Sequence, residues 1–284
     1  MRSVKYFIAA GAASLISTAA LAADMPSIMP PPPAVYAPPP VDPCCNFGGW
    51  YLRGDIGMTN QKIKSLNNPD PNAALFTSVG MGFDSGVLWD IGAGYQFNNW
   101  FRADVTAQWR GRTNFHGSQF TTAFPGSALV DNYTGSKSEL TFMANGYVDL
   151  GTWWCVTPFI GAGIGTSYNQ ISSFRDDGFG NTFGVARPSS FVYAADNGKW
   201  NFAWALHAGL GYKVTQNVTV ELAYSYMNLG DATTGANSNF AGGPTAQFPW
   251  TMKTITSNDL KIGVRWNLDS PPAPVMPAPL IRKG

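Results

Sequence analysis

Charged residues are scarce in this chain, and so are the residue types that most often build catalytic and metal sites. Asp, Glu, Lys and Arg make up 12% of 284 residues, whereas soluble domains usually carry roughly 25%. The net charge is +1, which excludes the basic stripe that a nucleic-acid-binding protein needs. There are two histidines and three cysteines, and no apolar run reaches the ~18 residues that a membrane-spanning helix requires.

Aromatic residues and glycines are, by contrast, abundant. Phe, Trp and Tyr make up 14% of the chain, and there are 31 glycines. So many aromatic side chains need burial, which excludes a disordered chain. Together with the low charge and the lack of a spanning helix, this composition favours β structure that faces lipid.

The first 22 residues are organised like a secretory signal peptide. Arg2 and Lys5 precede an apolar stretch over residues 6–16, and an A-x-A pattern ends at Ala22. The apolar stretch is too short for a membrane anchor. We predict cleavage after Ala22 or the next residue, and export of the mature chain.

Prolines divide the mature chain into a body and two flanks. Of 21 prolines, nine lie between Pro26 and Pro43 and five between Pro271 and Pro279. Proline is kept out of strand interiors because it cannot donate a ladder hydrogen bond. We predict extended periplasmic linkers over 23–49 and 269–284; docking ligands, or spacers through peptidoglycan, are the alternative for these flanks.

Between the flanks, residues 50–268 contain eight segments in which apolar and polar residues alternate. This period of two is typical of β-strands. In the clearest segment, Val105 and Trp109 share one face while Arg102 and Asp104 share the other. The eight segments cover residues 50–58, 87–97, 101–110, 139–150, 160–165, 202–213, 218–226 and 259–268.

The connections between these segments alternate between long and short. This alternation, with tryptophans near strand ends, is typical of an outer-membrane barrel. We predict an all-β fold: an eight-stranded antiparallel transmembrane β-barrel with long extracellular loops and Pro-rich periplasmic flanks. A soluble sandwich or a lipocalin-like barrel is the alternative. The long connections are 60–84, 111–135, 169–199 and 230–251, and the short ones are 98–99, 151–155 and 215–217.

Several of these segments resemble a known family. Residues 49–57 (GWYLRGDIG), 92–104, 157–165 and 261–266 are similar to the porin-family small outer-membrane β-barrels of α-proteobacteria, of the OmpA/OmpX-like eight-stranded class. The resemblance implies a place in the cell outer membrane of a Gram-negative bacterium. It also implies a role like that of family members described as envelope proteins, surface antigens, adhesins or haem-binding proteins. Such barrels usually stop at a terminal aromatic residue, whereas here residues follow Leu268, which implies an internal signal for the outer-membrane assembly machinery.

The polar faces of the predicted strands carry charges that would point into the barrel. An eight-stranded barrel is just wide enough for side chains to fill, and buried charges must be paired. Their near-balance predicts a salt-bridge network that plugs the lumen; a narrow or gated pore is the alternative. The predicted interior network comprises Arg53, Asp55, Asp90, Arg102, Asp104, Arg110, Glu139, Asp149, His207, Lys213, Glu221, Asp259, Lys261 and Arg265.

We expect no catalytic, cofactor or metal site. His207 faces inward and Glu221 on the next strand could orient it, but no serine is evidently placed to complete a triad. The second histidine falls in a long connection. The pair Asp176-Asp177 before Gly178 offers fewer oxygens than calcium needs, so a solvated turn is predicted there.

The three cysteines fall where the barrel prediction places the periplasm. Cys44 and Cys45 precede the first strand, and Cys155 lies in a short connection. The periplasm is oxidising, and the residues between Cys44 and Trp50 can extend roughly 20 Å, enough to cross the barrel base. We predict a disulfide from Cys44 or Cys45 to Cys155; free thiols or a vicinal pair are the alternatives.

The long connections hold aromatic residues and almost no net charge. They either pack on one another above the barrel or form a partner surface. The aromatic residues of these connections are Phe120, Phe124, Phe174, Phe179, Phe183, Phe191, Tyr193, Phe240 and Phe248.

The expected function is that of a non-enzymatic outer-membrane protein that supports envelope integrity and presents its loops. A small diffusion pore (porin), or loop-mediated binding of a host molecule or haem, is the alternative. The expected partners are outer-membrane lipids and lipopolysaccharide, the assembly machinery, and peptidoglycan or an extracellular ligand. The near-neutral charge makes nucleic acid an unsuitable partner.

Overall fold

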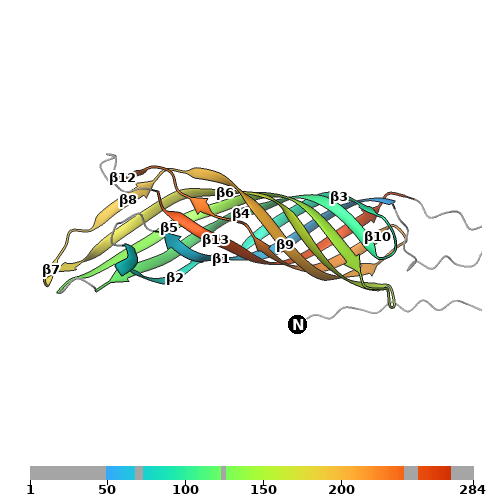
Figure 1. The fold of residues 1–284 in the computed structure, drawn as a ribbon, viewed down its shortest axis with the longest axis horizontal. Coiled ribbons are helices and arrows are strands. Elements are labelled where there is room, and N and C mark those ends of the chain that lie inside the picture. Colours follow the sequence, from blue (N-terminus) through green and yellow to red (C-terminus); the bar gives the residue numbers. More distant parts are fainter. Residues whose placement is uncertain (1–48, 68–72, 123–125, 240–248, 270–284) are drawn as a thin grey trace, which may run out of the picture. The chain divides into compact units, whose positions relative to one another are not determined.

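The computed structural model describes residues 49–67, 73–122, 126–239 and 249–269, all within one compact unit, Pro40–Gly284. These residues form one antiparallel sheet with a single short 3-10 helix, η1 (Ala73–Leu75) (Figure 1). Nowhere in these ranges is a helix long and apolar enough to cross a membrane. The predicted signal peptide and nearly all of both proline-rich flanks lie outside the described residues.

Eight strands of this sheet close into a ring. Each pairs antiparallel with its neighbour, and β1 pairs with β13 to close it. All eight alternating segments of the sequence lie in this ring. Its members are β1 (Gly49–Asn67), β3 (Gly86–Gln96), β4 (Phe101–Thr121), β5 (Ala128–Asp149), β6 (Val156–Thr182), β9 (Asn197–Lys213), β10 (Val218–Asn228) and β13 (Thr251–Asn267).

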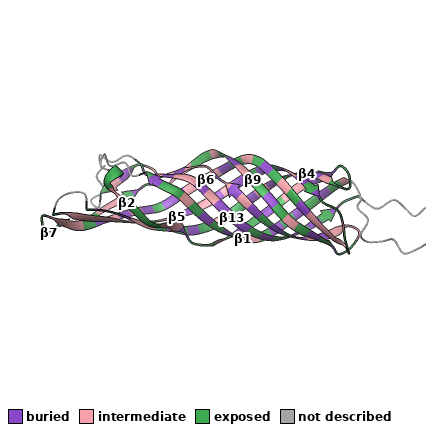
Figure 2. Ribbon diagram, turned by 60° about the horizontal axis from the view of Figure 1, so that its bottom comes forward, coloured by how far each residue is buried: buried purple, intermediate pink, exposed green. Residues whose placement is uncertain are grey.

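The two faces of the ring differ in chemistry, as the alternation of buried and exposed residues along each strand shows (Figure 2). In the first half of β1, Leu52 and Ile56 are exposed outward, whereas Arg53 and Asp55 are buried inside. Exposed apolar side chains on the outside and buried charges on the inside invert the arrangement of a soluble barrel. This outer face is suited to lipid.

The outward face becomes polar beyond Thr59 of β1. The exposed positions that follow Met58 on this face are Asn60, Lys62 and Lys64. An apolar face suits the hydrocarbon region and a polar face suits water. The far part of the sheet therefore projects beyond the apolar band, away from the end where β1 begins; we call it the distal extension.

The distal extension consists of strand where the sequence predicts long loops. The expectation for residues 111–135 is wrong, because β4 continues to Thr121 and β5 begins at Ala128. Much of 60–84 and of 169–199 is strand as well. The extension adds β2 (Thr77–Phe83), β7 (Val185–Ala186), β8 (Ser190–Ala194), β11 (Ala232–Thr233) and β12 (Asn237–Asn239) to the continuing ring strands.

Irregularities in the ladder explain why the sequence pattern ends early. The register shifts between Arg110 and Thr113 in β4 and between Thr134 and Ser136 in β5, and Ser173 of β6 has φ 53°. A bulge adds an unpaired residue and so changes which later side chains point inward. The period of two is therefore broken along the chain although the strand continues.

Beyond these irregularities the inward side chains are mainly apolar. Phe115, Phe174 and Trp250 are at most 1% exposed, and the Phe174 and Trp250 ring centroids lie 5.1 Å apart. We call this cluster the apolar core. It comprises Leu66, Phe83, Phe115, Tyr133, Met143, Ile171, Phe174, Ala194, Ala203, Ala205, Met227, Leu229, Ala232, Trp250, Met252 and Ile255.

Candidate functional site

The barrel interior at the level of the apolar outer band contains a cluster of buried charges. All fourteen residues predicted for the interior network are buried, each at most 7% exposed. Lys137 of β5, which the prediction omitted, is also buried and faces inward. Apart from His207, these residues are seven basic and seven acidic side chains, and we call them the ionic layer.

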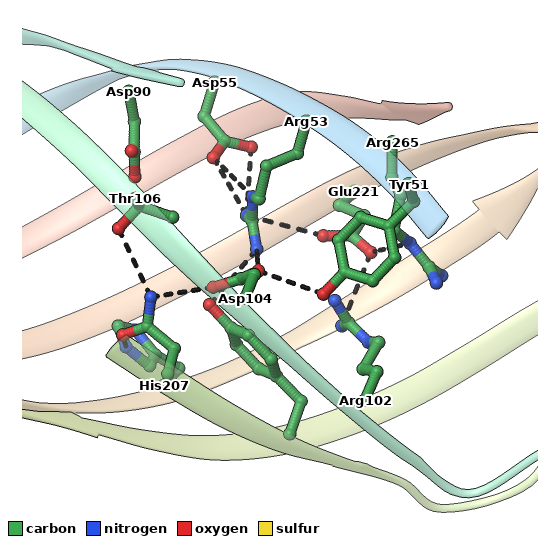
Figure 3. A network of polar contacts seen from close by, with 12 residues as sticks. Tyr51, Arg53, Asp55, Asp90, Arg102, Asp104, Thr106, His207, Glu221 and Arg265 are labelled. Carbon is green, nitrogen blue, oxygen red and sulfur yellow. Dashed lines mark hydrogen bonds and ion pairs between the residues drawn. The ribbon is translucent and has the colours of Figure 1, made fainter. Parts of the chain in front are cut away.

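Arg53 is the centre of one half of the ionic layer. Its guanidinium lies 2.9 Å from Asp55 Oδ2, 3.1 Å from Asp104 Oδ2 and 3.5 Å from Glu221 Oε2, as Figure 3 shows. It also donates a 3.1 Å hydrogen bond to the Tyr147 hydroxyl. Several acceptors thus surround a charge that would be costly to bury alone.

Glu221 of β10 joins three arginines from different strands. Its carboxylate lies 2.9 Å from Arg265 Nε and 3.4 Å from Arg102 Nη2, in addition to its contact with Arg53. Arg102 also pairs with Asp149 at 3.2 Å. Strands that are not neighbours in the ring are therefore linked across the lumen.

A second half of the ionic layer surrounds Arg110. This arginine pairs with Glu139 and, at 2.5 Å, with Asp259 Oδ2. Lys137 pairs with the same Glu139 and donates a 3.0 Å hydrogen bond to Gln61 Oε1. Lys137 shares the inward parity of Glu139 two residues later, so extending the alternation by one position would have found it.

Inward glycines let carboxylate and amide groups lie against the barrel wall. A Cβ added at Gly263 would lie 1.7 Å from Asp55 Oδ1, and one at Gly163 would lie 2.1 Å from Asn145 Oδ1. A larger residue at either position would displace these polar groups, so glycine gives them the room to lie there. Another ion pair of the layer joins Lys261 Nζ to Asp90 Oδ2 at 3.3 Å.

His207 has partners other than those that the sequence suggested. Its Nδ1 lies 2.8 Å from Ser225 Oγ and its Nε2 lies 3.2 Å from Asn145 Oδ1. A serine therefore lies within hydrogen-bond distance of His207, which the sequence did not predict. Glu221 pairs with arginines and does not orient the histidine. Ser225 is fully buried, so the serine has no open approach for a substrate.

Cys155 lies in the short connection between β5 and β6 and is disulfide-bonded. Its two candidate partners, Cys44 and Cys45, lie outside the described residues. The choice between them stays a prediction.

The aromatic residues predicted for the long loops have different surroundings. Phe174 belongs to the apolar core, whereas Phe179 and Phe183 are exposed. Phe191 and Tyr193 of β8 lie beside the Arg175 guanidinium, which is 4.9 Å and 5.8 Å from their ring centroids. Phe120 is exposed on β4, and Phe124, Phe240 and Phe248 lie outside the described residues.

The predicted solvated turn at Asp176-Asp177-Gly178 is wrong, because all three residues lie within β6. Asp177 pairs with Arg175, while Asp176 points inward and is 7% exposed. Burial, together with the nearby Asp131 and Asp177 charges, raises the pKa of Asp176 to about 8. Among the described residues, no group of three or more His, Cys, Asp or Glu side chains is arranged to hold a metal ion.

Comparisons with known proteins agree with this architecture. A family model described as an outer membrane protein beta-barrel domain matches residues 8–267. Outer membrane protein PagN of Salmonella typhimurium is 29% identical over 229 residues, which cover 77% of this chain and 89% of PagN. An uncharacterized protein of Brucella abortus is 31% identical over 204 residues, covering 64% of this chain and 69% of the relative.

Two further similarities come from a sequence relative and from a solved structure. A candidate adhesin of Rickettsia bellii is 30% identical over 227 residues, covering 79% of this chain and 90% of the relative. Neisserial surface protein A aligns with a TM-score of 0.42 and 17% identity, over 78% of this chain and 97% of its own. Since the family model spans the whole ring and most of the chain, the chain belongs to the outer-membrane β-barrel family and resides in the outer membrane of a Gram-negative bacterium.

Proposed function

We propose that this protein is a non-enzymatic envelope barrel with a closed lumen, which supports the outer membrane and presents its distal extension at the cell surface. The balanced ionic layer carries this proposal. Seven basic and seven acidic side chains are buried inside an eight-strand ring, and a ring of this size is just wide enough for its own side chains.

The apolar core is a second observation that supports a closed lumen. It lies inside the same barrel and contacts the ionic layer, since Arg110 Nη2 is 2.9 Å from Met227 Sδ. A conducting path would have to cross first fixed ion pairs and then packed aromatic side chains. Hydrophobic constrictions oppose the passage of water and ions. Both interiors therefore favour a barrel that does not conduct ions.

Single-channel recording tests this proposal against the pore alternative. The refolded full chain is reconstituted in a planar bilayer, after its folding is checked by the change in gel migration on boiling. We expect silence or rare, small events. Stable and reproducible openings would contradict the closed lumen and make the chain a small diffusion pore.

A second candidate function is attachment through the distal extension. Three exposed apolar residues favour it: Phe179, Phe183 and Val185 are 46%, 78% and 71% exposed around the β6–β7 connection. Exposed apolar groups of this kind commonly mark partner surfaces. A relative named as a candidate adhesin supports the same direction.

Shortening the β6–β7 hairpin tests attachment without disturbing the ring. We expect a chain in which residues 179–186 are replaced by a two-residue Asn-Gly turn to keep its gel mobility shift and lose binding to host cells. A second variant, Phe183→Ser, keeps the hairpin length and removes one exposed ring, so we expect it to weaken binding as well. Binding that survives both changes would contradict attachment through this hairpin.

A further inference from the structure

A small pocket opens in the distal extension, next to the buried carboxyl of Asp176. Its volume is about 260 Å³. We call it the Asp176 pocket, and the lining residues that matter here are Leu129, Asp131, Asp176, Arg187, Ser190 and Val192. They come from β5, β6, β8 and the segment between β7 and β8, so several elements converge on it.

Asp176 is unusual among the buried acids of this protein. Asp176 lines the pocket and is 7% exposed, and its buried Oδ1 has no hydrogen-bond partner. Asp90 and Glu221 of the ionic layer also have one oxygen without a hydrogen bond, but their carboxylates form ion pairs, and no ion pair is described for Asp176. A buried polar atom without a partner costs about 1–3 kcal/mol, and a bound donor in the pocket would remove that cost.

Two further oxygen-bearing side chains line the same pocket. A Cβ at Gly178 would lie 2.4 Å from Ser190 Oγ and 2.9 Å from Asp131 Oδ1, so glycine leaves both oxygens room to lie beside the strand. The Ser190 hydroxyl donates a long 3.5 Å hydrogen bond to the Gly178 carbonyl. Its lone pairs are then available as acceptors.

The chemistry of these three side chains selects a particular ligand. Two carboxyls and a hydroxyl supply acceptors within apolar walls that include Leu129 and Val192. A primary ammonium group has three N–H donors and no acceptor, which matches this set. A calcium ion needs six to eight oxygens, which is more than these side chains offer.

We propose that the Asp176 pocket binds a primary ammonium group, either from a lysine side chain of a partner protein or from a free polyamine. The ammonium would pair with Asp176 and donate to Asp131 and Ser190. Arg187 lines the pocket and is exposed to solvent. Its positive charge repels an ammonium group, but only weakly, because salt screens exposed charges.

Ligand-observed NMR titration of the refolded full chain tests this proposal. The probe is N-acetyl-lysine methylamide, and N-acetyl-norleucine methylamide is the control that lacks the ammonium group. We expect the lysine probe to bind at least about tenfold more tightly at about pH 9, where the Asp176 carboxyl is ionised and the lysine ammonium is still protonated. Equal binding of the two probes would overturn the proposal.

Matched variants locate the binding. We expect Asp176→Asn to remove the preference for lysine, Asp84→Asn on an exposed loop to keep it, and Arg187→Gln to tighten binding by up to about threefold. Each variant is first checked for the gel mobility shift of the folded barrel. A preference that survives Asp176→Asn would overturn the proposal.

Two competitors distinguish the sources of the ligand. Displacement of the lysine probe by spermidine at similar concentration supports a free polyamine. Displacement only by lysine-containing peptides supports a partner protein. Displacement by calcium at lower concentration than either amine would contradict an ammonium site.

Discussion

The ionic layer and the apolar core lie inside the same barrel but have opposite chemistry. Where the outer face is apolar, as at Leu52 and Ile56, the inward side chains are Arg53 and Asp55. Beyond the bulges, where outward positions such as Lys62 are polar, the interior is filled by phenylalanine, methionine and tryptophan. Each interior thus differs from its own outer face: charges lie behind the apolar outer face, and apolar side chains lie behind the polar one.

The ionic layer and the apolar core also differ in why a substitution would destabilise them. Pairing within the ionic layer offsets a large desolvation cost, so removing one partner leaves another charge uncompensated. The apolar core is stabilised by burial and packing, so removing atoms there loses contacts and leaves a cavity. Substitutions in the ionic layer and in the apolar core therefore test whether the two interiors are stabilised in different ways.

The largest effect is expected for Glu221→Gln in the ionic layer. The amide keeps the shape but removes the charge that Arg53, Arg102 and Arg265 share. We expect the free energy of unfolding to fall by about 3–5 kcal/mol. Urea titration of the barrel in lipid vesicles, followed by tryptophan fluorescence, measures it. A loss below about 1 kcal/mol would show that water already solvates these arginines.

A similar or smaller loss is expected for Met252→Ala in the apolar core. Met252 is 1% exposed, and truncating a buried methionine costs about 2–5 kcal/mol. The same urea titration measures the loss, and hydrogen exchange should place the weakened amides in the distal extension. Protection lost mainly in the first half of β1 instead would contradict the division into two interiors.

Asp176→Asn gives an effect of the opposite sign, a stabilisation whose size depends on pH. Since the pKa of Asp176 in the fold is about 8, the folded state keeps a proton that the unfolded chain loses near pH 4. The fold is therefore destabilised progressively as pH rises from about 4 to 8, because the folded state binds a proton that the unfolded chain has lost. We expect Asp176→Asn to be more stable than the native chain at pH 8 and similar to it at pH 4. Urea midpoints at the two pH values measure this, and equal pH slopes would contradict it.

No measurable change is expected for Asp177→Asn. Asp177 pairs with Arg175 on the outward face of β6, where both side chains are partly exposed to solvent. Exposed ion pairs contribute little to stability. A loss comparable to that of Glu221→Gln would show that burial does not set the strength of ion pairs in this barrel.

The sequence predicts the ring and much of its interior because lipid imposes a strict rule. Alternation with period two places Arg102 and Asp104 inside and Val105 outside, and no long-range information is needed. Which charges pair with which depends on barrel closure. The contact of Glu221 with Arg53 joins strands that are far apart along the chain.

The distal extension could not be predicted in the same way. The register shift after Arg110 and the left-handed Ser173 change the inward parity, so the alternation ends although hydrogen bonding continues. Asp176-Asp177-Gly178 then has the composition of a turn. Pairing with β5 and β8 overrides that local preference.

Hydrogen exchange of arginine side chains tests the closed ionic layer most directly. In ¹⁵N NMR of the refolded barrel, the Nε–H groups of Arg102 and Arg265, which donate to Asp149 and Glu221, are compared with that of exposed Arg187. A closed ionic layer should make hydrogen exchange at the two buried Nε–H groups slower than at Arg187 by on the order of a hundredfold, because water reaches them only when the structure opens. Exchange as fast as that of Arg187 would mean a water-filled lumen and would contradict a closed ionic layer.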